Sequence, residues 1–219
     1  MTAAAATPGA SSVSRSQRDA YRDDGPLARG LGRAFGPVSP LPAAALTLLS
    51  PLPSIALLAL EGDAVSEVAL GAAGAWSVLA GGVANGRPDW GRFGWVVPPL
   101  LRLLEYGTLL ALAVVAGPPA VSHCFALVGA LAFHHYDSVY RLRHQGSPPP
   151  AWLSIAGGGW DGRLVVAYVL LVTGALSTGL LAGAIVLGIV YVAESAVSWL
   201  RFGQAQRPAL YDHEEDEDD

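Results

Sequence analysis

Six apolar stretches, each near the length of a membrane-crossing helix, limit the fold of this chain more than any other feature. About 20 apolar residues in a helix cross the hydrocarbon core of a bilayer, which is about 30 Å thick. Backbone polar groups in a membrane must be hydrogen-bonded within the protein, so such stretches predict helices. The predicted spans cover residues 41–60, 64–84, 97–116, 119–137, 164–182 and 184–200.

The composition agrees with a membrane protein. Of the 219 residues, 52% are hydrophobic and only 14% are charged, whereas soluble domains carry roughly 25% charged residues. High hydrophobicity excludes a disordered chain, and a net charge of −5 lacks the basic excess of a nucleic-acid-binding protein. We therefore predict an all-α, polytopic membrane helix bundle in the cell membrane, in contact with membrane lipids and without a nucleic-acid partner.

The arginines predict the orientation of the bundle. All of them except Arg102 fall before the first span, after the second, after the fourth or after the sixth. Six alternating helices place these four segments on one side of the membrane, while the other side carries Glu61 and Asp63. Since arginine-rich segments stay in the cytoplasm, both termini are predicted to be cytoplasmic.

The chain divides into three predicted parts. Residues 1–26 contain no apolar run and are predicted to form a disordered arm. Residues 27–205 form the six-helix membrane domain. Residues 206–219 form a disordered acidic tail, because the run DHEEDEDD at 212–219 carries repelling carboxylates and nothing apolar to bury.

Several local features refine this picture. Leu27, Leu31 and Phe35 recur every four residues and share one helix face, which fits either a short helix in the inner membrane interface or a solvated linker. Pro51 and Pro53 predict a kink in the first span. The connections predicted at 117–118 and at 183 leave room only for tight hairpins.

Ionisable side chains inside predicted spans are costly, so they are candidates for function. In the predicted topology, helices three to six bring such groups to the same depth, near the inner leaflet. Arginine binds phosphate in a planar fork, while histidine and carboxylate groups can hold a divalent ion such as magnesium or transfer protons. The candidate acid–base or metal-binding residues are Glu105, His134, His135, Asp137, Asp161 and Glu194, and the candidate phosphate-binding residues are Arg102, Arg141 and Arg163.

Each of these residues also has a structural interpretation. Arg102 and Glu105 are three residues apart and can pair on one helix. Asp161 can cap the fifth helix at its N-terminus, and the two histidines at 134 and 135 can end the fourth helix at the headgroup level. The sequence leaves both interpretations open.

One short motif is treated as a chance match. The run Asp24-Gly25-x-x-Ala28-Arg29 matches the middle of the CDP-alcohol phosphatidyltransferase signature, D-x-x-D-G-x-x-A-R followed by G-x-x-x-D-x-x-x-D. Tyr21 stands where the first aspartate belongs, and residues 37–60 contain no aspartate. The metal-binding half of that signature is therefore missing.

Other motifs carry a resemblance to a known family. They are PPLLR at 98–102 with Glu105-Tyr106, FHHYDSVYRLR at 133–143, GWDGR at 159–163, and Glu194-Ser195. In this order they resemble an actinobacterial integral-membrane domain of unknown function, over about residues 27–205. That domain is often fused to CDP-alcohol phosphatidyltransferase domains, so the resemblance implies a link to head-group transfer.

Two functions are compatible with the sequence. In the first, the chain acts on a phospholipid or isoprenoid phosphate at the cytoplasmic face, with the candidate residues as its site. In the second, it is a non-catalytic membrane anchor or partner subunit for a separate CDP-alcohol phosphatidyltransferase.

Overall fold

The computed structural model describes residues 21–61, 64–86 and 94–211, with side chains up to residue 205. The described chain contains helices and loops but no strand, which confirms the predicted all-α class. The α-helices are α2 (Pro26–Phe35), α3 (Ala43–Leu49), α4 (Leu52–Glu61), α5 (Glu67–Asn85), α6 (Val97–Ala116), α7 (Pro118–His144), α8 (Ala151–Ala156), α9 (Gly159–Val172) and α10 (Leu176–Tyr211).

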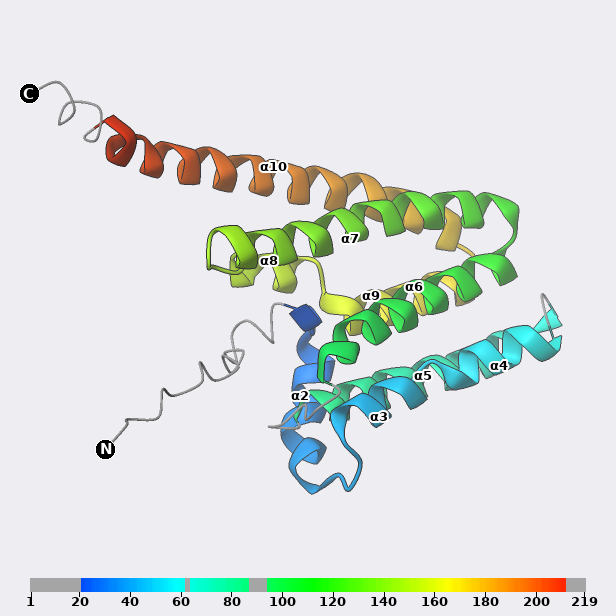
Figure 1. The fold of residues 1–219 in the computed structure, drawn as a ribbon. Coiled ribbons are helices and arrows are strands. Elements are labelled where there is room, and N and C mark those ends of the chain that lie inside the picture. Colours follow the sequence, from blue (N-terminus) through cyan, green and yellow to red (C-terminus); the bar gives the residue numbers. More distant parts are fainter. Residues whose placement is uncertain (1–20, 62–63, 87–93, 212–219) are drawn as a thin grey trace, which may run out of the picture.

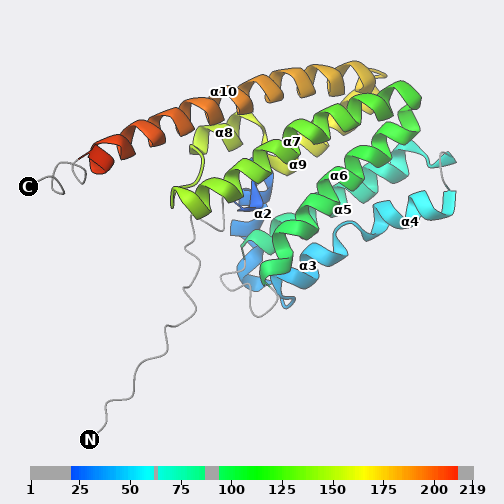
Figure 2. The ribbon, with the colours of Figure 1, turned by 45° about the horizontal axis from the view of Figure 1, so that its top comes forward.

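The long helices run side by side as an elongated bundle (Figures 1 and 2). The α6–α7 and α9–α10 turns lie at one end of the bundle. Helix α2, helix α8 and the start of α6 lie at the other end, and α10 projects past them. Because α10 has 36 residues, it is about 54 Å long and exceeds the thickness of a bilayer core.

Five segments are long and apolar enough to cross a membrane, as expected of a membrane bundle. They are Ala43–Glu61, Glu67–Asn85, Val97–Ala116, Ala151–Val172 and Leu176–Ala205. The fourth predicted span lies in α7, which has 27 residues but is not among the five. Histidine, aspartate and arginine residues in its C-terminal half lower its mean hydropathy.

The predicted kink in the first span is confirmed. Helix α3 ends at Leu49 and α4 begins at Leu52, with Pro51 between them and Pro53 in the first turn of α4. Proline has no N–H, so helix carbonyls are left without partners at this point. Two side chains of α5 compensate, since Trp76 Nε1 donates to the Leu49 carbonyl at 3.1 Å and Ser77 Oγ to the Ser50 carbonyl at 2.7 Å.

The last hairpin differs from its predicted position. Helix α9 ends at Val172 and α10 begins at Leu176, so the predicted spans 164–182 and 184–200, with a turn at 183, were wrong. Gly174 makes the turn with a φ of 72°, a conformation that glycine adopts without strain. Gly183 lies inside α10 and faces Leu127 of α7 instead.

Candidate functional site

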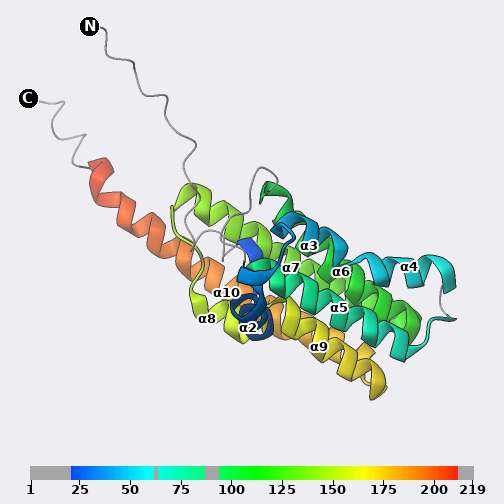
Figure 3. The same cartoon turned by 90° about the horizontal axis from the view of Figure 1, so that it is seen from below.

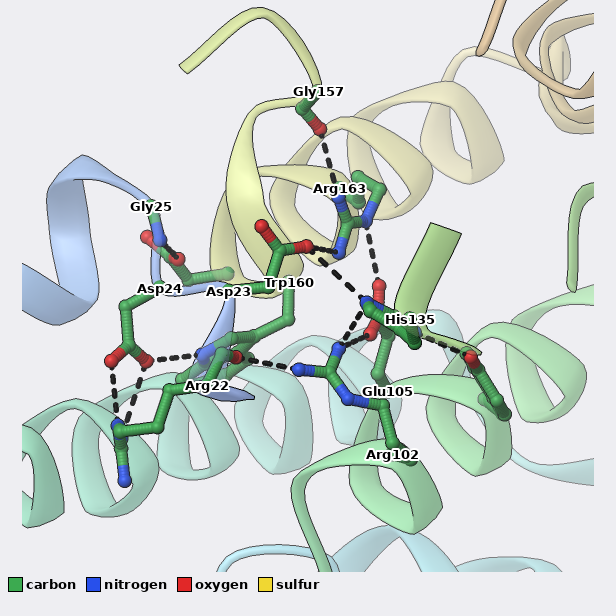
Figure 4. A network of polar contacts seen from close by, with 12 residues as sticks. Arg22, Asp23, Asp24, Gly25, Arg102, Glu105, His135, Gly157, Trp160 and Arg163 are labelled. Carbon is green, nitrogen blue, oxygen red and sulfur yellow. Dashed lines mark hydrogen bonds and ion pairs between the residues drawn. The ribbon is translucent and has the colours of Figure 1, made fainter. Parts of the chain in front are cut away.

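Charged side chains from α6, α7 and α9 meet the chain segment before α2 at the end of the bundle that carries α2 and α8 (Figure 4). Most of the predicted site residues lie here, but not in a single pocket. Glu105, His135, Arg102 and Arg163 form one cluster, while Asp137, Arg141 and Glu194 form a second between α7 and α10. Asp161 and His134 make separate contacts.

Arg163, in the first turns of α9, is the centre of the first cluster. Its Nε donates to Glu105 Oε1 at 2.6 Å, and its Nη2 donates to Asp23 Oδ2 at 2.8 Å. A third bond runs from Nη1 to the carbonyl of Gly157 at 3.1 Å. The guanidinium is thus held between two carboxylates and one carbonyl, and the side chain is buried.

Arg102, in the second turn of α6, completes this cluster. Its Nη1 lies 2.8 Å from Glu105 Oε2 and 2.6 Å from His135 Nε2. Its Nη2 donates to the carbonyls of Tyr21 and Arg22. Glu105 is fully buried and binds one arginine with each oxygen. His135 is also fixed on its other side, where Nδ1 lies 2.7 Å from Tyr106 Oη.

The segment Arg22–Gly25, which we call the N-terminal segment, is buried at this end of the bundle although it falls within the predicted arm. Arg22 Nε donates to Asp24 Oδ2 at 2.6 Å, and Arg22 Nη2 also reaches the carbonyl of Gly81 in α5. Trp160 Nε1 donates to Asp24 Oδ1 at 2.6 Å. Charged residues are buried here because each one has a partner with opposite charge or a fixed dipole.

Glycines allow the N-terminal segment to approach α9 closely. Gly159 has a φ of 63°, and a Cβ there would lie 2.8 Å from the carbonyl carbon of Asp24. On Gly25, a Cβ would lie 2.6 Å from Asp161 Oδ1. At this contact the backbone N–H of Trp160 donates to the backbone carbonyl of Asp23 at 3.1 Å. Larger residues at either glycine would separate the segment from the helix.

Asp161 stabilises the start of α2 rather than that of its own helix. Its Oδ1 accepts the N–H of Gly25 at 2.5 Å, and its Oδ2 accepts those of Leu27 and Ala28 at 2.9 and 3.0 Å. Asp161 is fully buried. The first N–H groups of a helix have no partner within the helix, so a carboxylate from α9 acts as the cap of α2.

The second cluster joins α7 to α10. Arg141 binds Glu194 in a bidentate pair, with N–O distances of 3.0 and 2.6 Å, and its Nε lies 2.7 Å from Asp137 Oδ2. Asp137 Oδ1 accepts Ser195 Oγ at 2.9 Å and Trp199 Nε1 at 3.1 Å. The two carboxylates therefore share one arginine. The other oxygen of Asp137 is occupied by the two donors from α10.

His134 is placed by aromatic packing. Its ring stacks on Tyr191 of α10, with centroids 4.1 Å apart and planes inclined by 13°. Both side chains are buried. The interaction adds a contact between α7 and α10.

The chain matches the model of a protein family. The profile of a family of unknown function (DUF5941) matches residues 14–217, which is most of the chain. The chain belongs to this family. No curated protein and no solved structure matches it.

The ionisation of Asp23 depends on the charged side chains around it. Burial alone would raise the pKa of its carboxyl, but Arg163, together with His135 and Arg102, holds that pKa well below its usual value. Asp23 is therefore charged at neutral pH. Its Oδ2 contacts Arg163 and His135, whereas its Oδ1 is buried without a hydrogen bond from the described residues.

The chemistry available to these groups follows from their partners. Glu105 and Asp161 use both oxygens, for guanidinium groups and for backbone N–H groups respectively. Within the described chain, no three His, Cys, Asp or Glu side chains are grouped so that they could hold a metal ion. The arrangement is thus suited to joining chain segments at one end of the bundle.

Sequence reasoning did not identify Arg22, Asp23, Asp24 and Trp160 as members of this cluster. The signal that could have found them is the run Asp24-Gly25-x-x-Ala28-Arg29, which matches a catalytic signature only in part. Asp23 and Asp24, which stand between Arg22 and Gly25, match the charges and the space at the start of α9.

Proposed function

We propose that this protein crosses the cell membrane six times, with α7 as the additional crossing and both termini in the cytoplasm. With 27 residues, α7 is about 40 Å long, and its N-terminal half is apolar. It runs between α6 and α10, both of which are apolar enough to cross. The arginines of α2, α6, α7 and α9 lie toward the same end of the bundle, which the positive-inside rule assigns to the cytoplasm.

Within this topology, we propose that the protein is a non-catalytic membrane module that anchors or assists a separate enzyme. The observation that carries this proposal is the pairing of the candidate catalytic groups with one another. Glu105 binds two arginines, Asp137 and Glu194 share a third, and Asp161 binds the backbone of α2. A residue that binds substrate needs an accessible carboxylate, whereas Glu105 and Asp161 are fully buried and both oxygens of each already contact donors of the protein.

The partner we propose is a CDP-alcohol phosphatidyltransferase. Support comes from the resemblance of the motifs around Glu105, His134, Asp161 and Glu194 to a domain that often accompanies such enzymes. Direct head-group transfer by this chain is the competing function. It would require the buried carboxylates to leave their arginines, so that the carboxylates could bind a metal ion and the arginines a lipid phosphate.

Co-expression tests this proposal. The tagged chain is produced with a CDP-alcohol phosphatidyltransferase from the same organism and purified in mild detergent. Release of CMP is then measured for each protein alone and for the two together. We expect the transferase to co-purify with the chain, its activity to rise in the complex, and the chain alone to release no CMP.

The opposite result is equally specific. Release of CMP by the chain alone would support head-group transfer. In that case the activity should be lost in Asp161→Asn and retained in the matched control Glu61→Gln. Glu61 is exposed at the far end of α4 and has no role in either cluster. Failure of the transferase to co-purify or to change its activity would contradict a partner role.

A further inference from the structure

Helix α2 presents three distinct faces. At about 100° per residue, Leu27, Leu31 and Phe35 fall on one side, and Arg29 and Arg33 fall on the opposite side. Ala28 and Gly32 lie between them on the side that is buried. Leu27 and Phe35 are about half exposed, at 46% and 52%. Two opposite faces of the helix, one apolar and one basic, are thus left for contacts outside the bundle.

The bundle holds α2 in a fixed orientation. Figures 1 and 3 show α2 running across the direction of the long helices at the end of the bundle. Its buried face packs on α5 so closely that a Cβ on Gly32 would lie 2.8 Å from the Gly86 nitrogen. Asp161 caps its first turn. These contacts hold Leu27 and Phe35 on the exposed side of the helix, while Leu31 lies partly buried beside Gly82 of α5.

We propose that α2 lies in the cytoplasmic headgroup layer and binds anionic phospholipid. This inference rests on the proposed topology. A helix that runs across the bundle axis lies in the plane of the membrane. Its apolar face then reaches the acyl chains while its arginines point toward the phosphates and water, as in interfacial amphipathic helices.

Charge indicates which lipid is recognised. Helix α2 contains two arginines and no carboxylate, and the carboxylates that precede it, Asp23 and Asp24, are paired within the protein. The charges on the basic face of α2 are therefore all positive. Basic residues at this depth attract anionic leaflets and have little preference for zwitterionic ones.

The depth of α2 can be measured by site-directed spin labelling. Cys124, the single cysteine, is buried and is replaced by alanine, and labels are attached in Phe35→Cys and Arg33→Cys after reconstitution into phosphatidylglycerol vesicles. We expect the label at position 35 to collide with oxygen and to be shielded from a water-soluble nickel chelate, and the label at 33 to show the reverse. Equal access of the chelate to both labels would overturn the proposal and favour a solvated linker.

Lipid selectivity is tested by paired charge variants. We expect added phosphatidylglycerol to raise the melting temperature of the protein, and Arg29→Gln/Arg33→Gln to remove at least half of that rise. The control Arg29→Lys/Arg33→Lys keeps the charge and should keep the effect. An unchanged rise in the glutamine variant would refute anionic recognition. Reporter fusions at the termini check the topology separately, so an error there is distinguishable from a failure of α2 to bind lipid.

Discussion

Replacing Glu105 with glutamine should strongly destabilise the protein. Glu105 is fully buried and lies 2.6 Å from Arg163 Nε and 2.8 Å from Arg102 Nη1. Glutamine has nearly the same shape but no charge, and its amide group would place a donor against one of the two guanidinium groups. Arg163 would keep Asp23, whereas Arg102 would have no carboxylate in contact.

The size of the effect follows from the buried charge that is left unpaired. Removing one partner of a buried ion pair costs about 3–5 kcal/mol, so we expect a loss of that order in the free energy of unfolding. Adding Arg102→Gln should restore part of it, because the unpaired charge is then removed. Restoration should be incomplete, since Arg102 also donates to the carbonyls of Tyr21 and Arg22.

The assay is unfolding in mixed detergent micelles, followed by tryptophan fluorescence. Glu61→Gln is the control, because Glu61 is exposed at the opposite end of the bundle. A Glu105→Gln variant that is as stable as the parent protein, or more stable, would contradict this explanation. That outcome would mean that the carboxylates repel one another, as expected of a site that awaits a cation.

Three further predictions concern the same contacts. Asp161→Ala removes the cap of α2 and should cost about 1–2 kcal/mol, and protease cleavage near Arg29 should accelerate while the long helices stay protected. Glu194→Gln should destabilise less than Glu105→Gln, because Arg141 keeps Asp137; an equal loss in parallel melting curves would contradict this ranking. Since the folded-state pKa of Asp23 is lowered, its stabilisation is present above the unfolded value of about 3.9 and is lost as pH falls toward the folded value. Asp23→Asn should therefore flatten the fall of stability below about pH 4.

Much of the fold follows from local chemistry that can be seen in the sequence. Apolar stretches predicted the long helices, Pro51 and Pro53 predicted the break between α3 and α4, and the short gap at 117–118 predicted the α6–α7 turn. The last turn was misplaced because Gly174 and Gly183 are equally plausible in an apolar sequence. Only packing distinguishes them, since Gly183 faces α7 and Gly174 has a positive φ.

The polar clusters were predicted only in part, for a physical reason. Depth along each helix can be counted from the sequence, so the meeting of Arg102, Glu105, His135 and Arg163 at one level could be expected. The direction in which a side chain points around its helix depends on tertiary packing. The N-terminal segment has no apolar periodicity that would predict its burial. It is buried because Arg102 of α6 and Arg163 of α9 bind it, and these contacts depend on the tertiary structure.

We infer that these charges stabilise the fold by pairing with one another. A double-mutant cycle on Asp23 and Arg163, whose Oδ2 and Nη2 atoms are 2.8 Å apart, measures that pairing. The free energy of unfolding is measured for Asp23→Asn, Arg163→Gln and the double variant, with and without magnesium and anionic lipid. We predict a coupling energy of about 1–3 kcal/mol that neither addition changes. Additive losses, together with a stabilisation by magnesium or lipid that Asp23→Asn abolishes, would contradict it.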